Sequence, residues 1–290
     1  MLIFGTLAIR MEKLQYISTR SFEEMKLMDT SALRSNFHLP EVFVSGDVSG
    51  YYIAEDRMIV LGAVPLQRDL LLPVFHDFTK SAYLLERREL GIINVGGPGK
   101  VVADGEHYSM RTKDSLYIGV GVKDITFSSD DAHNPAKFYM NSAPAYQPCP
   151  IVHIPYENVE PLVAGQAENA NFRKIYQCII PGKVSSNQLV MGFTELQAGS
   201  IWNTMPPHVH LRRHEIYLYF NVPDHQMVVH LMGKPDETRH IIMRDGEAVY
   251  SPSWSIHSGA GTANYSFVWS MAGENQDYKD MDMVAVNEIK

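Results

Sequence analysis

The sequence of 290 residues has only two cysteines, Cys149 and Cys178, which lie far apart and form no CxxC pair. This scarcity excludes a disulfide framework and a thiolate metal site, and it favours the reducing cytoplasm as the location. No apolar run approaches the roughly 18 residues of a membrane span. The apolar stretch Met1–Ile9 lacks the charged segment and cleavage site of a signal peptide, and translation can begin at Met1 or at Met11.

The chain also lacks an excess of positive charge. It contains 25 Lys and Arg against 33 Asp and Glu, which gives a net charge of -8. This balance, together with the absence of a basic run, argues against a nucleic-acid partner. The glycine-rich segment Gly96–Lys100 lacks the spacing of a phosphate loop, and we expect a hairpin turn there.

Helical periodicity is scarce as well. Only the segment Phe22–Asn36 places apolar residues at helical steps, and we expect a helix there. Elsewhere, short β-rich runs alternate with turns of Gly, Pro, Asp and Asn, a spacing that predicts an all-β sandwich or barrel. The clearest runs are residues 42–44, 58–62, 91–95 and 115–118.

An internal repeat indicates two copies of one β module. Residues 110–117 are similar to residues 243–250 at an offset of 133, and residues 88–93 are similar to residues 214–219 at an offset of 126. We therefore expect two domains, over residues 1–150 and 151–290. The connection between them is expected in the proline-rich stretch from residue 145 to residue 171.

The most informative stretch is Pro206–Glu215. His208 and His210 follow a Pro-Pro pair, which excludes the interior of a helix, and alternate residues of an extended strand face the same side. Glu215 opens a strand-like run, and His257 follows downstream after a glycine turn and a proline turn. Three imidazoles and one carboxylate predict a divalent metal site, and such ligands suit Zn, Mn, Fe or Ni.

The order of these ligands resembles the two signature motifs of the cupin superfamily. Several segments resemble the 5-keto-4-deoxyuronate isomerase family, also called 4-deoxy-L-threo-5-hexosulose-uronate ketol-isomerase. They are Leu85–Gly91, Pro135–Tyr139, Trp202–Pro206, Glu237–His240, Ser251–Gly259 and Gly273–Gln276. The resemblance runs from about Leu33 to the C-terminus. With the repeat, it implies an all-β bicupin of two tandem double-stranded β-helix (jelly-roll) barrels with a few short helices.

The N-terminal copy of the repeat lacks the metal ligands. No HxH precedes Glu89, and Asp124 stands where a counterpart of His257 is expected. We expect this barrel to keep the fold, to bind no metal, and to serve packing and subunit assembly, while the C-terminal barrel carries the chemistry.

The resemblance implies zinc as the cofactor, at one ion per chain. It also implies the reaction, which converts 5-dehydro-4-deoxy-D-glucuronate to 3-deoxy-D-glycero-2,5-hexodiulosonate during the degradation of pectin and similar polyuronides. A divalent cation chelated by a carbonyl and its adjacent hydroxyl stabilises the enediolate of such a ketol isomerisation. The resemblance further implies a homo-oligomer, with a hexamer as the suggested form.

The groups that bind the substrate and move the proton stay open at this point. Arg212 and Arg213 are candidates for anchoring the uronate carboxylate, and at most one of them points inward from an extended segment. Glu195, Tyr217 and His240 are candidates for the catalytic base. Two other functions are open alternatives: a cupin dioxygenase that uses iron and oxygen, and a non-catalytic sugar-binding cupin.

Overall fold

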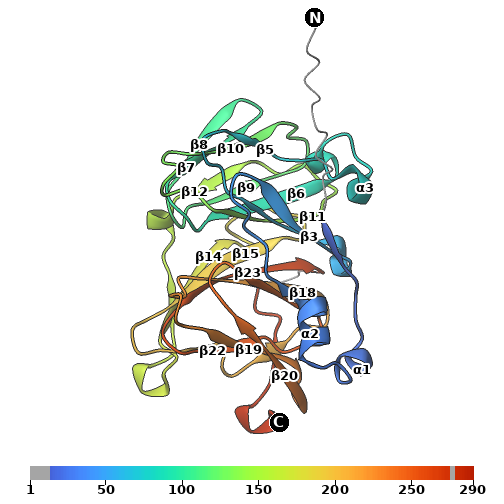
Figure 1. Cartoon of the computed structure of the whole chain (residues 1–290), viewed down its shortest axis with the longest axis vertical. Coiled ribbons are helices and arrows are strands. Elements are labelled where there is room, and N and C mark those ends of the chain that lie inside the picture. Colours follow the sequence, from blue (N-terminus) through green and yellow to red (C-terminus); the bar gives the residue numbers. More distant parts are fainter. Residues whose placement is uncertain (1–13, 275–277) are drawn as a thin grey trace, which may run out of the picture.

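The computed structural model describes residues 14–274 and 278–290 and consists mainly of β-strands (Figure 1). These strands form two units stacked along the long axis, and each unit pairs a seven-stranded sheet with a four-stranded sheet. This arrangement confirms the predicted all-β fold of two tandem jelly-roll barrels. Met1 and Met11, the two candidate translation starts, lie outside the described residues. So do Asn275 and Gln276 of the family-like segment Gly273–Gln276.

The larger N-terminal sheet has the strand order β1 (Gln15–Ile17), β3 (Val48–Ile53), β4 (Ile59–Ala63), β11 (Phe138–Pro144), β6 (Arg88–Asn94), β9 (Ser115–Ile118) and β12 (Val152–Ile154). The smaller sheet has the order β5 (Leu70–Leu71), β10 (Ile125–Ser129), β7 (Gly99–Ala103) and β8 (Glu106–Met110). Buried aliphatic and aromatic side chains between the two sheets form the core of this unit.

The larger C-terminal sheet has the strand order β13 (Leu162–Ala164), β14 (Arg173–Ile179), β15 (Val190–Leu196), β23 (Ser266–Gly273), β18 (Arg213–Phe220), β21 (Ala248–Ser251) and β2 (His38–Leu39). The smaller sheet has the order β16 (Trp202–Asn203), β22 (Ser258–Gly261), β19 (Val228–Lys234) and β20 (Glu237–Met243). A separate pair joins β17 (His208–Val209) to β24 (Asp282–Met283).

Three of the four predicted β-rich runs coincide with strands. Residues 58–62, 91–95 and 115–118 correspond to β4, β6 and β9. The prediction for residues 42–44 is wrong, because this segment forms no strand. Instead, this segment packs against β4 at Gly62. A Cβ atom added to Gly62 would lie only 2.2 Å from the carbonyl oxygen of Val42. That approach requires a glycine.

The helix predicted over residues 22–36 is interrupted. The structure has α1 (Phe22–Met25) and α2 (Thr30–Phe37) in its place. Ser21 caps α1 in a capping box with Glu24, and the Asp29 carboxylate accepts a backbone hydrogen bond of 2.8 Å at the start of α2. A second N-cap residue inside the periodic segment therefore restarts the helix. The remaining short helices are α3 (His76–Thr79) and five 3₁₀ turns, η1 (Glu55–Arg57), η2 (Leu84–Glu86), η3 (Tyr156–Asn158), η4 (Ala167–Asn169) and η5 (Val286–Glu288). No described helix has the length and apolar character needed to cross a membrane.

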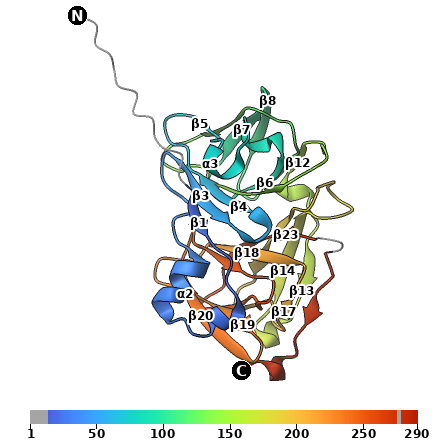
Figure 2. The same ribbon diagram turned by 90° about the vertical axis from the view of Figure 1, so that its right-hand side faces the viewer.

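The N-terminal segment crosses to the C-terminal barrel. Strand β2 pairs with β21, and the Arg34 guanidinium on α2 donates a hydrogen bond of 3.0 Å to the carbonyl oxygen of Ile242 on β20. Figures 1 and 2 both show α2 beside β20. The chain passes from the N-terminal sheet to the C-terminal sheet between β12 and β13. We propose that the boundary between the two units along the chain lies in residues 155–161, a few residues after the expected division at residue 150.

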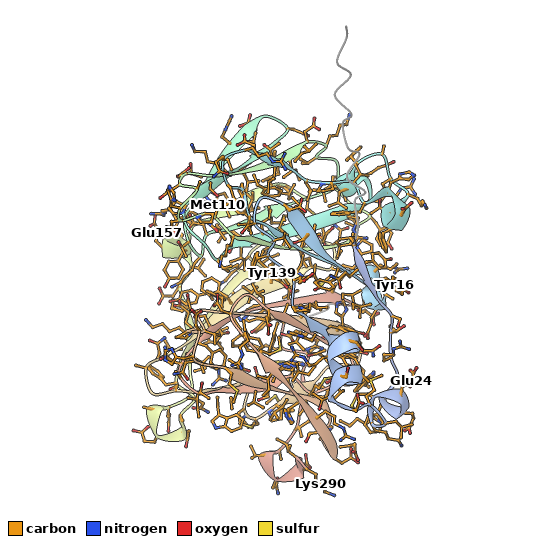
Figure 3. All side chains as sticks on the ribbon, in the orientation of Figure 1. Tyr16, Glu24, Met110, Tyr139, Glu157 and Lys290 are labelled. Atoms are coloured by element: carbon orange, nitrogen blue, oxygen red, sulfur yellow. The ribbon has the colours of Figure 1, made fainter. Side chains whose placement is uncertain are left out.

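The two larger sheets pack back to back. Gly91 lies in this interface, where an added Cβ would come within 2.9 Å of the side chains of Ile179, Leu189 and Met191. Figure 3 shows Tyr139, which is fully buried, between the two barrels. The absence of a side chain at Gly91 allows this close approach of the sheets.

Glu89 joins the two barrels from inside this interface. Its buried carboxylate accepts hydrogen bonds from the backbone N–H groups of Asn187, Gln188 and Leu189, at 2.7 to 2.8 Å, and from the Tyr117 hydroxyl at 2.6 Å. Four donors therefore compensate the buried charge.

The strand registers correct one of the two repeat offsets. Leu90 pairs with Ile118, and Glu215 pairs with Ser251, which matches the offset of 133 between β9 and β21. The counterpart of Glu215 is therefore Leu90, and the offset of 126 that aligned Glu89 with Glu215 is wrong by one residue. A shift of one residue moves a side chain to the other face of a sheet. Glu89 faces the interface between the barrels, whereas Glu215 faces the interior of its barrel.

We predict that Glu89→Gln lowers the free energy of unfolding by about 2 to 4 kcal/mol. Each carboxylate oxygen accepts two hydrogen bonds, and the NH2 group that replaces one oxygen would face two buried donors. Urea unfolding measures this difference. Glu106 is exposed on β8 and serves as the control. We expect Glu106→Gln to change the free energy of unfolding by less than about 0.5 kcal/mol. Equal stabilities for the two variants would contradict the role of Glu89.

Candidate metal centre

The four predicted ligands converge inside the C-terminal barrel. His208 lies on β17, His210 follows that strand, Glu215 lies on β18, and His257 directly precedes β22. One ligand atom from each residue lies within 4.8 Å of the others. Within residues 14–274 and 278–290, this is the one group of three or more His, Cys, Asp or Glu side chains with such a geometry.

The distances within this cluster are short. Oε2 of Glu215 lies 2.9 Å from Nε2 of His210 and 2.9 Å from Nε2 of His257. Nε2 of His257 lies 2.9 Å from Nε2 of His208. Three ring nitrogens and a carboxylate oxygen therefore point at one small volume from three separate segments of the chain.

A backbone carbonyl orients one of the three imidazoles. Nδ1 of His210 lies 2.9 Å from the carbonyl oxygen of Arg213. A proton on Nδ1 donates to that oxygen and leaves the lone pair of Nε2 directed at the cluster. Nδ1 of His257 is buried and has no hydrogen-bond partner in the described part of the chain.

The surroundings favour a neutral His208 and a charged Glu215. Burial, followed by the electrostatic effect of His257, holds the pKa of His208 well below its ordinary value. Burial alone raises the pKa of Glu215, but the neighbouring His257 and His210 outweigh it and hold that pKa well below the usual range. Metal ligands must be deprotonated, so both shifts favour binding of a cation.

The donor set fits a divalent metal ion. Metal–nitrogen bonds of about 2.0 to 2.1 Å in tetrahedral geometry separate neighbouring ligand atoms by roughly 3.3 Å, close to the spacings in this cluster. Two ring nitrogens at 2.9 Å with their lone pairs facing each other repel unless a proton or a cation lies between them. The cluster could therefore hold a metal ion, and nitrogen and oxygen donors leave its identity open.

A cavity of about 440 Å³ opens beside the cluster. Three alternate residues of β18, namely Arg213, Glu215 and Tyr217, line one wall, as the period of a strand requires. The other lining residues are Leu162, Arg173, Ile175, Thr194, Thr204, Met205, Pro206, His208, Phe267, Trp269, Met271, Tyr278, Lys279, Met281 and Met283. The cavity is mainly apolar with a few polar groups, as is typical of small-molecule sites.

The C-terminal segment, residues 278–283, closes one side of the cavity. Its strand β24 pairs with β17, so that Met283 lies opposite the ligand His208. Figure 2 shows this segment along the side of the C-terminal barrel, next to β17 and β13. The end of the chain therefore forms part of the site.

Tyr217 is the one predicted base candidate that lines the cavity. Its hydroxyl lies 2.9 Å from Oγ1 of Thr204. Burial, and then the neighbouring Glu215 carboxylate, hold the pKa of Tyr217 well above its ordinary value. The phenol therefore stays protonated near neutral pH and can donate a hydrogen bond to a bound oxygen.

The structure places the other two base candidates elsewhere. Glu195 forms an ion pair with Lys113 and accepts a hydrogen bond of 3.4 Å from Tyr156, away from the cavity. His240 is exposed on β20, in the smaller sheet. Both residues lie on strands, and the sequence of these strands does not indicate whether a given side chain lies in the site or on the surface.

The two candidate arginines share one acidic partner. Arg213 is buried and lines the cavity, and its Nη1 lies 2.6 Å from the Asp280 carboxylate. Arg212 is exposed and forms an ion pair of 2.9 Å with the same carboxylate. One of the pair points inward, as the extended segment predicted, but Asp280 already neutralises part of its charge.

Sequence reasoning missed Arg173 and the C-terminal segment. Arg173 stands next to Lys174 in β14, and only the pairing of β14 with β15 determines which of the two faces the cavity. The segment 278–283 reaches the site from about 60 residues beyond the end of β18, and its sequence carries no motif that signals this.

Comparisons with known proteins identify a family model and close sequence relatives. A family model described as KduI/IolB family matches residues 76–289. A 4-deoxy-L-threo-5-hexosulose-uronate ketol-isomerase of Formosa agariphila is 50% identical over 268 residues, which cover 92% of this chain and 95% of that protein. A second relative, the ketol-isomerase 2 of Rhizobium meliloti with the same substrate name, is 51% identical over 263 residues, which cover 91% of this chain and 93% of that protein.

The fold is also similar to solved structures. A crystal structure of an IolB-like protein from Salmonella typhimurium has a TM-score of 0.65 at 15% sequence identity, and the match covers 78% of this chain and 87% of that chain. At this low identity the likeness concerns the arrangement of the strands alone.

We predict that His257→Ala removes most of the bound metal, because the remaining donors no longer surround an ion. Elemental analysis of the purified protein measures this, with about one equivalent per chain expected for the native sequence. His240→Ala is the control, since His240 is exposed and distant in the fold, and this variant should keep its metal. Stoichiometric metal in His257→Ala, or an ion bound inside the N-terminal barrel, would contradict the assignment.

Proposed function

The chain belongs to the KduI/IolB family, and we propose that it is a ketol-isomerase acting on 4-deoxy-L-threo-5-hexosulose uronate, also named 5-dehydro-4-deoxy-D-glucuronate. The family resemblance read from the sequence is thereby confirmed. The observation that carries the activity is the His/Glu cluster at the wall of an apolar cavity, in a chain that matches ketol-isomerases over nine-tenths of its length. The product is 3-deoxy-D-glycero-2,5-hexodiulosonate.

The reaction moves a carbonyl between neighbouring carbons. A proton leaves the hydroxyl-bearing carbon beside the aldehyde, and a proton returns to the former aldehyde carbon. A divalent ion held by His208, His210, Glu215 and His257 supplies stabilisation of the negative charge that develops on the substrate oxygens. Nitrogen and oxygen donors without thiolates are compatible with zinc, which is the ion we propose, and with Mn, Fe or Ni.

Tyr217 contributes a fixed hydrogen-bond donor in this proposal. Its phenol faces the cavity two residues from Glu215 on the same strand, and Thr204 holds its hydroxyl at 2.9 Å. A neutral donor placed beforehand at the reacting oxygens stabilises charge that appears only in the transition state. The raised pKa of Tyr217 keeps it in the donating form.

The setting of the enzyme is also part of the proposal. We place it in the cytoplasm, on a path that degrades pectin and similar polyuronides, and both of its cysteines are free thiols. We propose that it assembles as a homo-oligomer, with a hexamer as the form suggested by the family. Exposed apolar side chains, such as Leu162 at 53% on the rim of the cavity and Leu211 at 70%, are compatible with contacts between subunits.

We predict isomerisation of the keto-deoxyuronate without oxygen or nicotinamide, and loss of turnover on removal of the metal with a chelator. The reaction is run anaerobically in heavy water and followed by NMR. Deuterium at the former aldehyde carbon of the product indicates an enediolate, because a proton taken by a base exchanges with solvent. The methylene beside the ketone exchanges without the enzyme and is not diagnostic. A failure to convert this substrate, together with oxygen uptake on another one, would favour the dioxygenase. Hexuronate binding without turnover of any substrate would favour the sugar-binding cupin.

We predict that Tyr217→Phe lowers kcat by about 100-fold, the usual effect of removing one donor to a developing charge. The metal content should stay at the native level, because Tyr217 is not among the ligands. Tyr108→Phe in the N-terminal barrel is the matched control and should keep the native kcat. Native turnover in the metal-loaded Tyr217→Phe variant would remove this role.

A further inference from the structure

Among the described residues, three side chains of Arg or Lys line the cavity. They are Arg173, Arg213 and Lys279. Arg213 is committed to the Asp280 carboxylate at 2.6 Å. Lys279 is exposed on the C-terminal segment. Arg173 differs from both, because it is partly buried in the wall of the cavity and has no acidic partner within residues 14–274 and 278–290.

The contacts of Arg173 leave most of its donors unused. Its Nη1 donates a hydrogen bond of 2.8 Å to the carbonyl oxygen of Asn171. Among the residues that the structure describes, no carboxylate forms an ion pair with it. Burial lowers the pKa of its guanidinium from the ordinary value, although interactions with Tyr217 and Tyr278 oppose this effect. A partly dehydrated cation with open donors gains more from an incoming carboxylate than an exposed one does.

Arg173 faces the metal cluster across the cavity. It lies on β14, and Glu215 lies on β18, three places along the strand order of the same sheet. Three strand spacings of about 4.8 Å amount to roughly 14 Å. The strand registers also place Arg173 about six residues farther along the strands than Glu215, a further displacement of roughly 20 Å, so the two backbones stand more than about 20 Å apart. Both side chains extend into the cavity from this curved sheet, which leaves room between the guanidinium and the ligand cluster for a small molecule.

A hexuronate has the corresponding shape and charge. Its reacting aldehyde and hydroxyl lie at one end of the six-carbon chain, and its carboxylate lies at the other. With C–C bonds of about 1.5 Å, an extended chain of six carbons measures on the order of 6 Å. A ligand of this length spans two separated sites, one that acts on the aldehyde end and one that binds the carboxylate.

We propose that Arg173 binds the carboxylate of the substrate and so determines that the enzyme takes uronates rather than neutral sugars. This inference rests on the proposed function. The planar guanidinium can pair with both carboxylate oxygens, which fixes the far end of the substrate while the carbonyl end lies at the His/Glu cluster. Arg173 therefore replaces Arg212 and Arg213 as the carboxylate anchor.

The test compares Arg173→Met and Arg173→Lys with Lys174→Met. Lys174 is the neighbouring residue on the same strand, and its side chain is directed to the opposite face, so this control removes one positive charge without changing the cavity. We expect Arg173→Met to raise the KM for the keto-deoxyuronate by about 10- to 100-fold, as expected for the loss of charge-assisted hydrogen bonds. The value of kcat should change little, because the contact is the same in substrate and transition state.

We expect Arg173→Lys to be intermediate, since a lysine keeps the charge and loses the paired geometry. Metal content and melting temperature should match the native protein in all three variants. A second measurement uses calorimetry with D-glucuronate and D-glucose on the metal-loaded protein. Binding of D-glucuronate should weaken in Arg173→Met, and any binding of D-glucose should be unaffected.

The outcomes separate this inference from the proposed function. Native KM and native D-glucuronate binding in Arg173→Met, with an active native enzyme, would overturn the anchor and leave the isomerase intact. D-glucuronate binding that depends on Arg173, in a native protein that does not convert the keto-deoxyuronate, would overturn the isomerase and keep the anchor. An equal loss of affinity in Lys174→Met would also overturn the anchor, because the effect would then follow from net charge alone.

Discussion

The site depends on the compensation of one buried carboxylate. Glu215 lies inside the barrel, where an unpaired negative charge is strongly unfavourable, and three imidazoles surround it. Because β18 is hydrogen-bonded to β21 on one side and to β23 on the other, the backbone of Glu215 cannot shift without breaking two ladders. The barrel therefore holds the charge in place, and the cation that we propose for this cluster would balance it. The short spacings within the cluster follow from this requirement.

The two barrels show how a change of one residue in register changes the use of a carboxylate. Both larger sheets carry a glutamate near the start of the equivalent strand, Glu89 on β6 and Glu215 on β18. Glu215 faces inward and joins the His cluster, while Glu89 faces outward and binds three backbone N–H groups of the other barrel. Leu90, at the true counterpart of Glu215, contributes to an apolar core. The same fold thus supports a His/Glu cluster beside a cavity in one copy and a contact between the barrels in the other.

The sequence predicted those features that depend on local spacing. Alternation along strands identified β4, β6 and β9, and the HxH pair with Glu215 and His257 identified a cluster that the structure brings together. It could not predict features set by pairing between distant segments. The side of β14 that faces the cavity follows from its register with β15, and the approach of Asp280 to Arg213 follows from the path of the last residues. The break between α1 and α2 could have been predicted from Asp29, which is a favourable N-cap residue. Apolar periodicity alone does not indicate this break.

The same distinction explains why the adjacent arginines were attractive candidates and Arg173 was not. A pair of arginines between candidate metal ligands is conspicuous in a sequence. Because these arginines are close to the ligands along the chain, they also lie within reach of the segment that closes the cavity. Asp280 in that segment pairs with both Arg212 and Arg213, so their charges stabilise the closing strand. A carboxylate anchor must instead stand apart from the ligand cluster by the length of the substrate, and the other end of the same sheet meets that condition. Arg173 reaches the cavity from that end, on a strand with no recognisable motif.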